Sequence, residues 1–149
     1  MSNLLDNTVF HISIGVILAT LLLWILSRLS NKTRHFILFA GLMVAAFIYL
    51  LFALINFNLQ WIFVESGGLT VFVIMSIIGL KKHPLFLGVG WLVHILWDVC
   101  LHTDPTTSFI PSWYPMFCVG FDLVIACYLI VISLKQPTHS MAFITPSKE

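Results

Sequence analysis

The sequence predicts an all-α, polytopic membrane protein with five transmembrane helices. Of its 149 residues, 60% are hydrophobic and only 9% are charged, and the mean hydropathy is +1.04. A soluble core of this size cannot bury so much apolar surface, so we expect the chain to be embedded in a bilayer. Five apolar runs approach the roughly 20 residues that span a membrane, and they cover residues 8–27, 36–55, 59–80, 84–101 and 116–134.

The breaks between these runs have the composition of turns. The segments RLSNKTRH (28–35) and KKHP (81–84) are polar, and the second places a proline at a helix start. The segment TDPTTSFIPSWYP (103–115) carries three prolines, which predicts a loop without regular helix. We therefore predict a single helical domain over 1–135, followed by a short cytoplasmic tail over 136–149 that we expect to be disordered.

The basic residues predict the orientation. All seven Lys and Arg residues fall on the side that holds the 28–35 and 81–82 turns and the C-terminus. By the positive-inside rule this side is cytoplasmic, so the N-terminus and the 102–115 loop face outward. Trp91 and Trp97 are then expected to anchor outward helix ends at the membrane interface.

Ionisable side chains gather in the outward half of three predicted helices. Glu65 and Asp122 each lie six residues in from the outer start of their helices, while Asp98 and His94 lie near the outer end of 84–101. At about 1.5 Å per residue, these four side chains reach a similar depth. We therefore predict that Glu65, His94, Asp98 and Asp122 form one buried site and are its catalytic residues.

This predicted site has no basic partner inside the membrane. A carboxylate at the centre of a spanning helix costs about 2.5–3.5 kcal/mol on insertion scales, so it must be protonated, pair with a protonated histidine, or hold a cation. His94, Asp98 and His102 recur every four residues on one helix face, which makes them candidate ligands of a divalent metal. Each residue alone could equally be a hydrogen-bonding group that bridges two helices.

Two of the three cysteines lie near the predicted outward surface. In an oxidising compartment Cys100 and Cys118 could pair across the 102–115 loop, and otherwise they remain free thiols. Cys127, deep in the last predicted helix, is expected to be a small packing residue.

The run HILWDVCLH (94–102), followed by WYPMFCVGFDLVIACYL (113–129), resembles a family of small bacterial integral membrane proteins of unknown function. The pattern is HxxxDxxxH followed by WYPxxCxxxD across the last two predicted helices. The resemblance implies no particular reaction, and it implies a bacterial inner membrane protein in which eight residues act as one unit: His94, Asp98, His102, Trp113, Tyr114, Pro115, Cys118 and Asp122.

Three functions remain open for such a site. An intramembrane enzyme could act on a lipid or isoprenoid by acid–base chemistry or through a metal-activated water. A structural or assembly subunit could use the polar residues to bind a second copy or another membrane protein. A proton- or ion-coupled transport component could use them to carry ions, although polar residues thin out toward the cytoplasmic side. A net charge of +1, without a basic patch, argues against nucleic acid as a partner.

Reporter fusions test the predicted orientation. A reporter fused after Lys135 should behave as cytoplasmic, and one inserted in the 103–112 loop should behave as exported. In a eukaryotic membrane, the NKT sequon at Asn31 should stay unmodified, because its turn faces the cytosol. Glycosylation of Asn31 would reverse the orientation and the depth assignments that depend on it.

Overall fold

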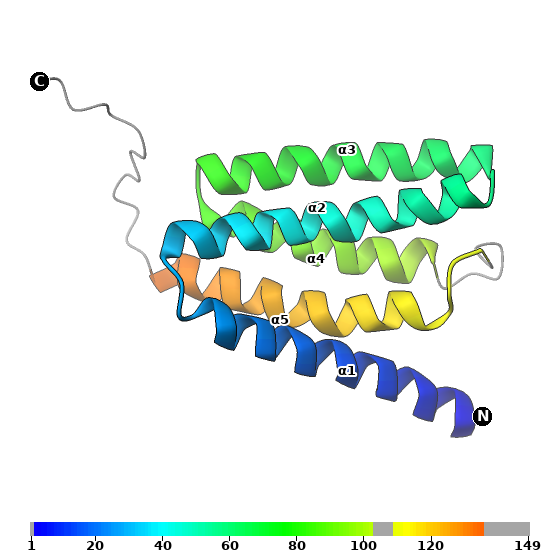
Figure 1. The fold of residues 1–149 in the computed structure, drawn as a ribbon, viewed down its shortest axis with the longest axis horizontal. Coiled ribbons are helices and arrows are strands. Elements are labelled where there is room, and N and C mark those ends of the chain that lie inside the picture. Colours follow the sequence, from blue (N-terminus) through cyan, green and yellow to red (C-terminus); the bar gives the residue numbers. More distant parts are fainter. Residues whose placement is uncertain (1, 103–108, 136–149) are drawn as a thin grey trace, which may run out of the picture.

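Five α-helices make up the part of the protein that the structure describes (Figure 1). The computed structural model describes residues 2–102 and 109–135. The helices are α1 (Ser2–Leu26), α2 (Asn31–Ile55), α3 (Leu59–Lys81), α4 (Pro84–Leu101) and α5 (Trp113–Lys135). The described residues contain no β-strand, so the all-α prediction is confirmed; the predicted tail over 136–149 lies outside them.

Each helix is long and apolar enough to cross a membrane. The outer faces carry large apolar side chains, such as Phe63 (79% exposed) and Leu134 (76% exposed). A continuous surface of this kind is stable against lipid and unstable against water. The chain is therefore a multi-pass membrane protein, as the sequence predicts. The side of the membrane that each terminus faces remains a prediction.

Three helices begin earlier than predicted, because polar first turns in α1 and α2 and a proline in the first turn of α5 lie outside the apolar runs. The observed starts are Ser2, Asn31 and Trp113, against predicted starts at 8, 36 and 116. The start of α2 is fixed by Ser30, whose hydroxyl accepts a hydrogen bond from the backbone N–H of Thr33. Pro115 is the third residue of α5, where proline is accepted because first-turn N–H groups have no intrahelical acceptor. The prediction that 103–115 is entirely non-helical is therefore wrong at its last three residues.

Helix α5 holds the centre of the packing, as it lies between α1 and α4. Helix α3 packs against α2 and α4, so α2, α3, α4 and α5 enclose the core while α1 covers the outer side of α5 (Figure 1). Neighbours along the chain run antiparallel, which makes α4 and α5 an antiparallel pair and α1 and α5 a parallel one. The core is thus bounded by helices that come from opposite ends of the sequence.

Basic residues mark one end of the bundle, called the basic end below. It holds the α1–α2 turn, the α3–α4 turn and the end of α5, with Arg28, Lys32, Arg34, Lys81, Lys82 and Lys135. The Arg34 guanidinium donates hydrogen bonds to the carbonyl of Leu26 at 3.1 Å and to the hydroxyl of Tyr128 on α5 at 2.8 Å. These bonds tie three helices together, since they join Arg34 of α2 to the end of α1 and to α5. The opposite end, called the far end, holds the α2–α3 turn.

Two glycines let α1 and α5 approach until their backbones touch. A Cβ atom on Gly15 would meet the carbonyl oxygen of Phe117, and one on Gly120 would meet that of Ile12. Small residues at helix crossings permit such contact, which drives association where lipid replaces water. Asp122 lies two residues after Gly120, about 200° around the helix, and therefore faces away from α1.

Gly120→Ala tests this packing. The added methyl group would meet the backbone of α1, so we expect a loss of about 1–3 kcal/mol in the free energy of unfolding, despite the better helix propensity of alanine. Gly67→Ala is the matched control, because nothing lies within 4 Å of a Cβ added there, and it should be neutral or stabilising. Unfolding in mixed micelles measures both variants, and equal stabilities would contradict the backbone contact.

Candidate functional site

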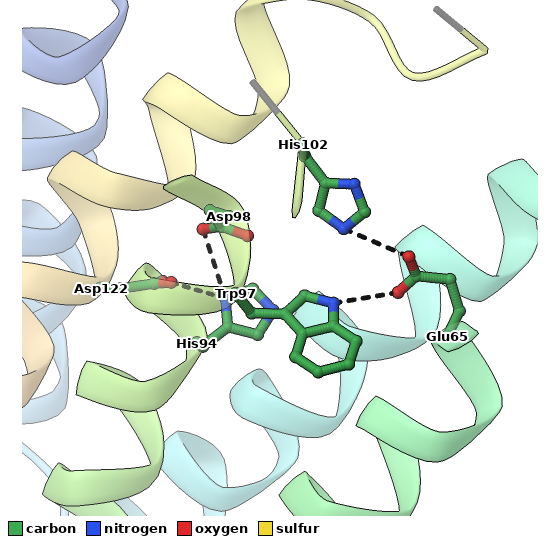
Figure 2. Close-up of polar contacts among 6 residues, drawn as sticks. All are labelled: Glu65, His94, Trp97, Asp98, His102 and Asp122. Carbon is green, nitrogen blue, oxygen red and sulfur yellow. Dashed lines mark hydrogen bonds and ion pairs between the residues drawn. The ribbon is translucent and has the colours of Figure 1, made fainter. Parts of the chain in front are cut away.

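Three ionisable side chains meet at the interface of α4 and α5 (Figure 2). His94 lies on α4, Asp98 follows it by four residues, and Asp122 comes from α5. Nδ1 of His94 lies 2.8 Å from Oδ2 of Asp122, a hydrogen bond, and 3.5 Å from Oδ2 of Asp98. His94 and Asp98 are 0% exposed and Asp122 is 1% exposed. These three residues are called the His94 centre below.

Helix geometry explains why these side chains converge. His94 and Asp98 are four residues apart, so they lie on one face of α4. Gly88, on the same helix, lets α5 come close, since a Cβ there would lie 3.1 Å from the Leu129 side chain. Because α5 is held between α4 and α1, the face of α5 that carries Asp122 is turned toward His94.

Several polar atoms of the His94 centre have no hydrogen-bond partner in the part of the chain that the structure describes. They are Nε2 of His94 and both carboxylate oxygens of Asp98. Tyr49 of α2 and Cys118 of α5 lie beside Asp98, and neither is a positively charged group. A buried carboxylate that accepts no hydrogen bond is costly, so Asp98 differs from an ordinary structural polar residue.

A second polar group lies nearer the far end (Figure 2). Nε1 of Trp97 donates a hydrogen bond of 3.2 Å to Oε2 of Glu65, and Nε2 of His102 lies 3.2 Å from Oε1 of the same carboxylate. These three residues are called the Glu65 group. Tyr49 connects the two sites, since its ring stacks on His102 at 4.1 Å between centroids and lies 5.8 Å from the ring of His94.

The residues predicted as one site are thus divided between two groups. His94, Asp98 and Asp122 converge, whereas Glu65 lies in the second group. The predicted metal set of His94, Asp98 and His102 is also split, because His102 contacts Glu65 and Asp122 takes its place beside His94. Each four-residue step turns about 40° around a helix, and His102 lies past the end of α4 as its C-cap, so its side chain leaves the face of His94.

The sequence does not predict Tyr49 as part of the site, and the position it predicts for Trp91 is wrong. Trp91 is 1% exposed and lies in the core, so its predicted role as an interfacial anchor is wrong. Trp97 is half-buried and binds Glu65. Trp91 lies three residues before His94, a spacing that could have placed it on the buried face. Nothing in the apolar run around Tyr49 marks it as part of a site.

The cysteines are all free thiols. Cys118 is buried beside Tyr114, whereas Cys100 is exposed on α4, so the disulfide considered for them is not formed. Cys127 is exposed on α5, and its predicted role in core packing is wrong.

The His94 centre can support two kinds of chemistry. An imidazole held by carboxylates can give or take a proton. Alternatively, the three side chains could hold a divalent metal, since each offers a ligand atom and these atoms lie within 4.8 Å of one another. The Glu65 group differs, because its carboxylate already has an N–H donor and an imidazole against it.

The chain belongs to a family of unknown function, DUF6010, whose family model matches residues 7–135. The match reaches into all five helices and includes both polar groups. Neither a curated protein nor a solved structure matches the chain. The predicted membership of an uncharacterised family is therefore confirmed, and the description of this family names no reaction.

Gly68→Ala tests how the Glu65 group is held. A Cβ on Gly68 would lie 2.5 Å from the Trp97 indole, so the variant must displace the indole and weaken its bond to Glu65. We expect a loss of about 1–3 kcal/mol in the free energy of unfolding. Gly67→Ala again serves as the control, because its added Cβ meets nothing.

A double-mutant cycle isolates the contact with the indole. In a Trp97→Leu background most of the cost of Gly68→Ala should disappear, because the smaller side chain leaves room for the methyl group. The same cost in both backgrounds would show that the indole is not what Gly68 accommodates.

Proposed function

We propose that this member of the DUF6010 family is an intramembrane enzyme that acts on a lipid or isoprenoid at the His94 centre. One observation carries the proposal: three ionisable side chains, each 0–1% exposed, meet inside an apolar bundle without a Lys or Arg among their described contacts. Ionisable residues are expensive inside a membrane and are usually kept there for function. A purely structural polar group would be saturated with hydrogen bonds, whereas neither oxygen of Asp98 has a partner with good hydrogen-bond geometry, although the Tyr49 hydroxyl and the His94 imidazole both face it.

The surroundings of the centre support the substrate class. The ring of His94 is flanked by Phe72, at 5.0 Å between centroids, and by Tyr49. The outer faces of the bundle are apolar, so a molecule already dissolved in the bilayer can approach without first crossing a charged surface. A lipid or isoprenoid combines an apolar chain with a polar or unsaturated group that this centre could attack.

The arrangement of His94 supports an acid–base step. A carboxylate bound to one imidazole nitrogen orients the ring and leaves the other nitrogen for proton transfer. Asp122 binds Nδ1 of His94, and Nε2 has no partner in the described chain. The proposed reaction therefore moves a proton onto or off the lipid, at Nε2.

The cellular location forms part of the same proposal. The positive-inside rule would place the basic end in the cytoplasm and the His94 centre in the outward half of the bilayer. In a bacterial inner membrane, the substrate would then be a lipid of the periplasmic leaflet. Assembly with a membrane partner and ion-coupled transport remain the alternatives, and neither requires a lipid to change chemically.

Incubation with lipids in D₂O tests the proposal. Wild-type protein is reconstituted with a total lipid extract of its source cells, and mass spectrometry then follows changes in mass and deuterium content of each lipid. We expect one lipid or isoprenoid to be converted, and we expect His94→Gln to slow that conversion by about 100-fold or more. The control is His11→Gln on α1, a histidine that lies beside the exposed Phe10.

The outcomes separate the functions. Conversion by wild type and His11→Gln, with loss in His94→Gln, supports the enzyme. If wild type converts no lipid, or His94→Gln converts it as fast as wild type, the His94 centre is not an enzyme site, and assembly or transport becomes the better account.

A further inference from the structure

The Asp98 carboxylate has no cationic partner of its own. Its side chain is 0% exposed and neither oxygen accepts a hydrogen bond within the described chain. The nearest group able to carry positive charge is His94, whose Nδ1 lies 3.5 Å away and is already bonded to Asp122 at 2.8 Å. One imidazole therefore faces two carboxylates.

The other groups around Asp98 cannot balance this charge. Tyr49, Tyr114 and Cys118 lie beside it, and all three are neutral or acidic side chains. The Lys and Arg residues that the structure describes lie at the basic end, in turns or near helix ends. Two carboxylates with one protonated imidazole retain a net negative charge, which a low-dielectric interior penalises heavily. The charge balances in two ways: one of the carboxylates carries a proton beside the protonated imidazole, or a divalent cation lies between the two carboxylates and a neutral imidazole. The metal content of the protein distinguishes these two states.

We propose that His94, Asp98 and Asp122 bind a divalent cation. The cation would lie on the Nδ1 side of His94, where both carboxylates converge (Figure 2). Ligands about 2.0–2.2 Å from a metal lie up to about 4.4 Å from one another, and the three ligand atoms here already lie within 4.8 Å. Small side-chain rotations are therefore enough to close the site.

The donor set favours a first-row transition ion. Mg²⁺ and Ca²⁺ prefer oxygen-only sites with six or more ligands, whereas one imidazole with two carboxylates suits Zn²⁺ or Mn²⁺. Three protein ligands leave at least one position for water or substrate, which is typical of catalytic rather than structural metal sites.

This inference deepens the proposed function and rests on it only for the use of the cation. With Nδ1 as a ligand, the one proton of the neutral imidazole lies on Nε2, so His94 would donate a proton rather than accept one, and the cation would stabilise negative charge that develops on a lipid. Binding itself does not require that the protein is an enzyme, so a metal measurement and the lipid measurement can fail separately.

Metal analysis of purified variants tests the site. Protein is purified without chelator, equilibrated with Zn²⁺ or Mn²⁺ alone, passed through a desalting column, and analysed by inductively coupled plasma mass spectrometry. We expect one ion per wild-type chain and an affinity at least about tenfold lower in Asp98→Asn and in Asp122→Asn. Glu65→Gln is the matched control, because it removes an equally buried carboxylate from the second polar group, and it should retain the ion.

A spectroscopic measurement on the unmutated protein tests the metal site even if the variants fail to fold. Replacement of the bound ion by Co²⁺ should give a visible absorption band typical of an imidazole and carboxylate site, and excess Zn²⁺ should abolish it. Wild-type protein without metal or band, or equal metal loss in Glu65→Gln and Asp98→Asn, would overturn the proposal. Protein that binds no metal but converts a lipid would refute the cation site and support the enzyme, and protein that binds the metal but converts no lipid would support the cation site and refute the enzyme.

Discussion

The burial of two carboxylates against one imidazole, between α4 and α5, is the constraint on which the rest of the structure depends. In an apolar interior a carboxylate is tolerated only beside compensating charge or hydrogen bonds. The bond between His94 and Asp122 gives part of that compensation, and it requires α4 and α5 to keep their distance and rotation. The contact at Gly120 between α5 and α1 serves this requirement, because it fixes α5 from the side opposite Asp122.

The two polar groups show that burial alone does not define a functional site. Glu65 is 2% exposed, and its Oε2 accepts a hydrogen bond from the Trp97 N–H, while its Oε1 lies 3.2 Å from Nε2 of His102 without good hydrogen-bond geometry. Asp98 is as deeply buried, but its oxygens accept no hydrogen bond. We therefore interpret the Glu65 group as a structural contact, because it holds α3 against α4 and positions the ring of His102 on Tyr49. The Asp98 carboxylate shares the imidazole of His94 with Asp122, and this is why we propose a ligand site at the His94 centre.

The fold could be predicted from the sequence because the length and hydropathy of a spanning helix are local properties. The depth of Glu65, His94, Asp98 and Asp122 was also accessible, since it follows from their position in each apolar run. Their grouping was not, because it depends on helix rotation and on which helices are neighbours. The four-residue spacing predicts His102 on the same helix face as His94. In the structure α4 ends before His102, and the His102 side chain contacts Glu65 of α3 instead. Tyr49 could not be found at all, because only tertiary packing brings α2 against the centre.

Disulfide trapping in the membrane tests the central claim most directly, which is that Asp98 and Asp122 face each other across α4 and α5. In a background without native cysteines, Asp98→Cys is combined with Asp122→Cys. The control pair combines Asp98→Cys with Leu123→Cys, because Leu123 follows Asp122 directly but is 46% exposed. The account predicts rapid oxidation or short-reagent crosslinking for the first pair and little for the second. Equal crosslinking of both pairs, or crosslinking of the Leu123 pair alone, would contradict the convergence of the two carboxylates on His94.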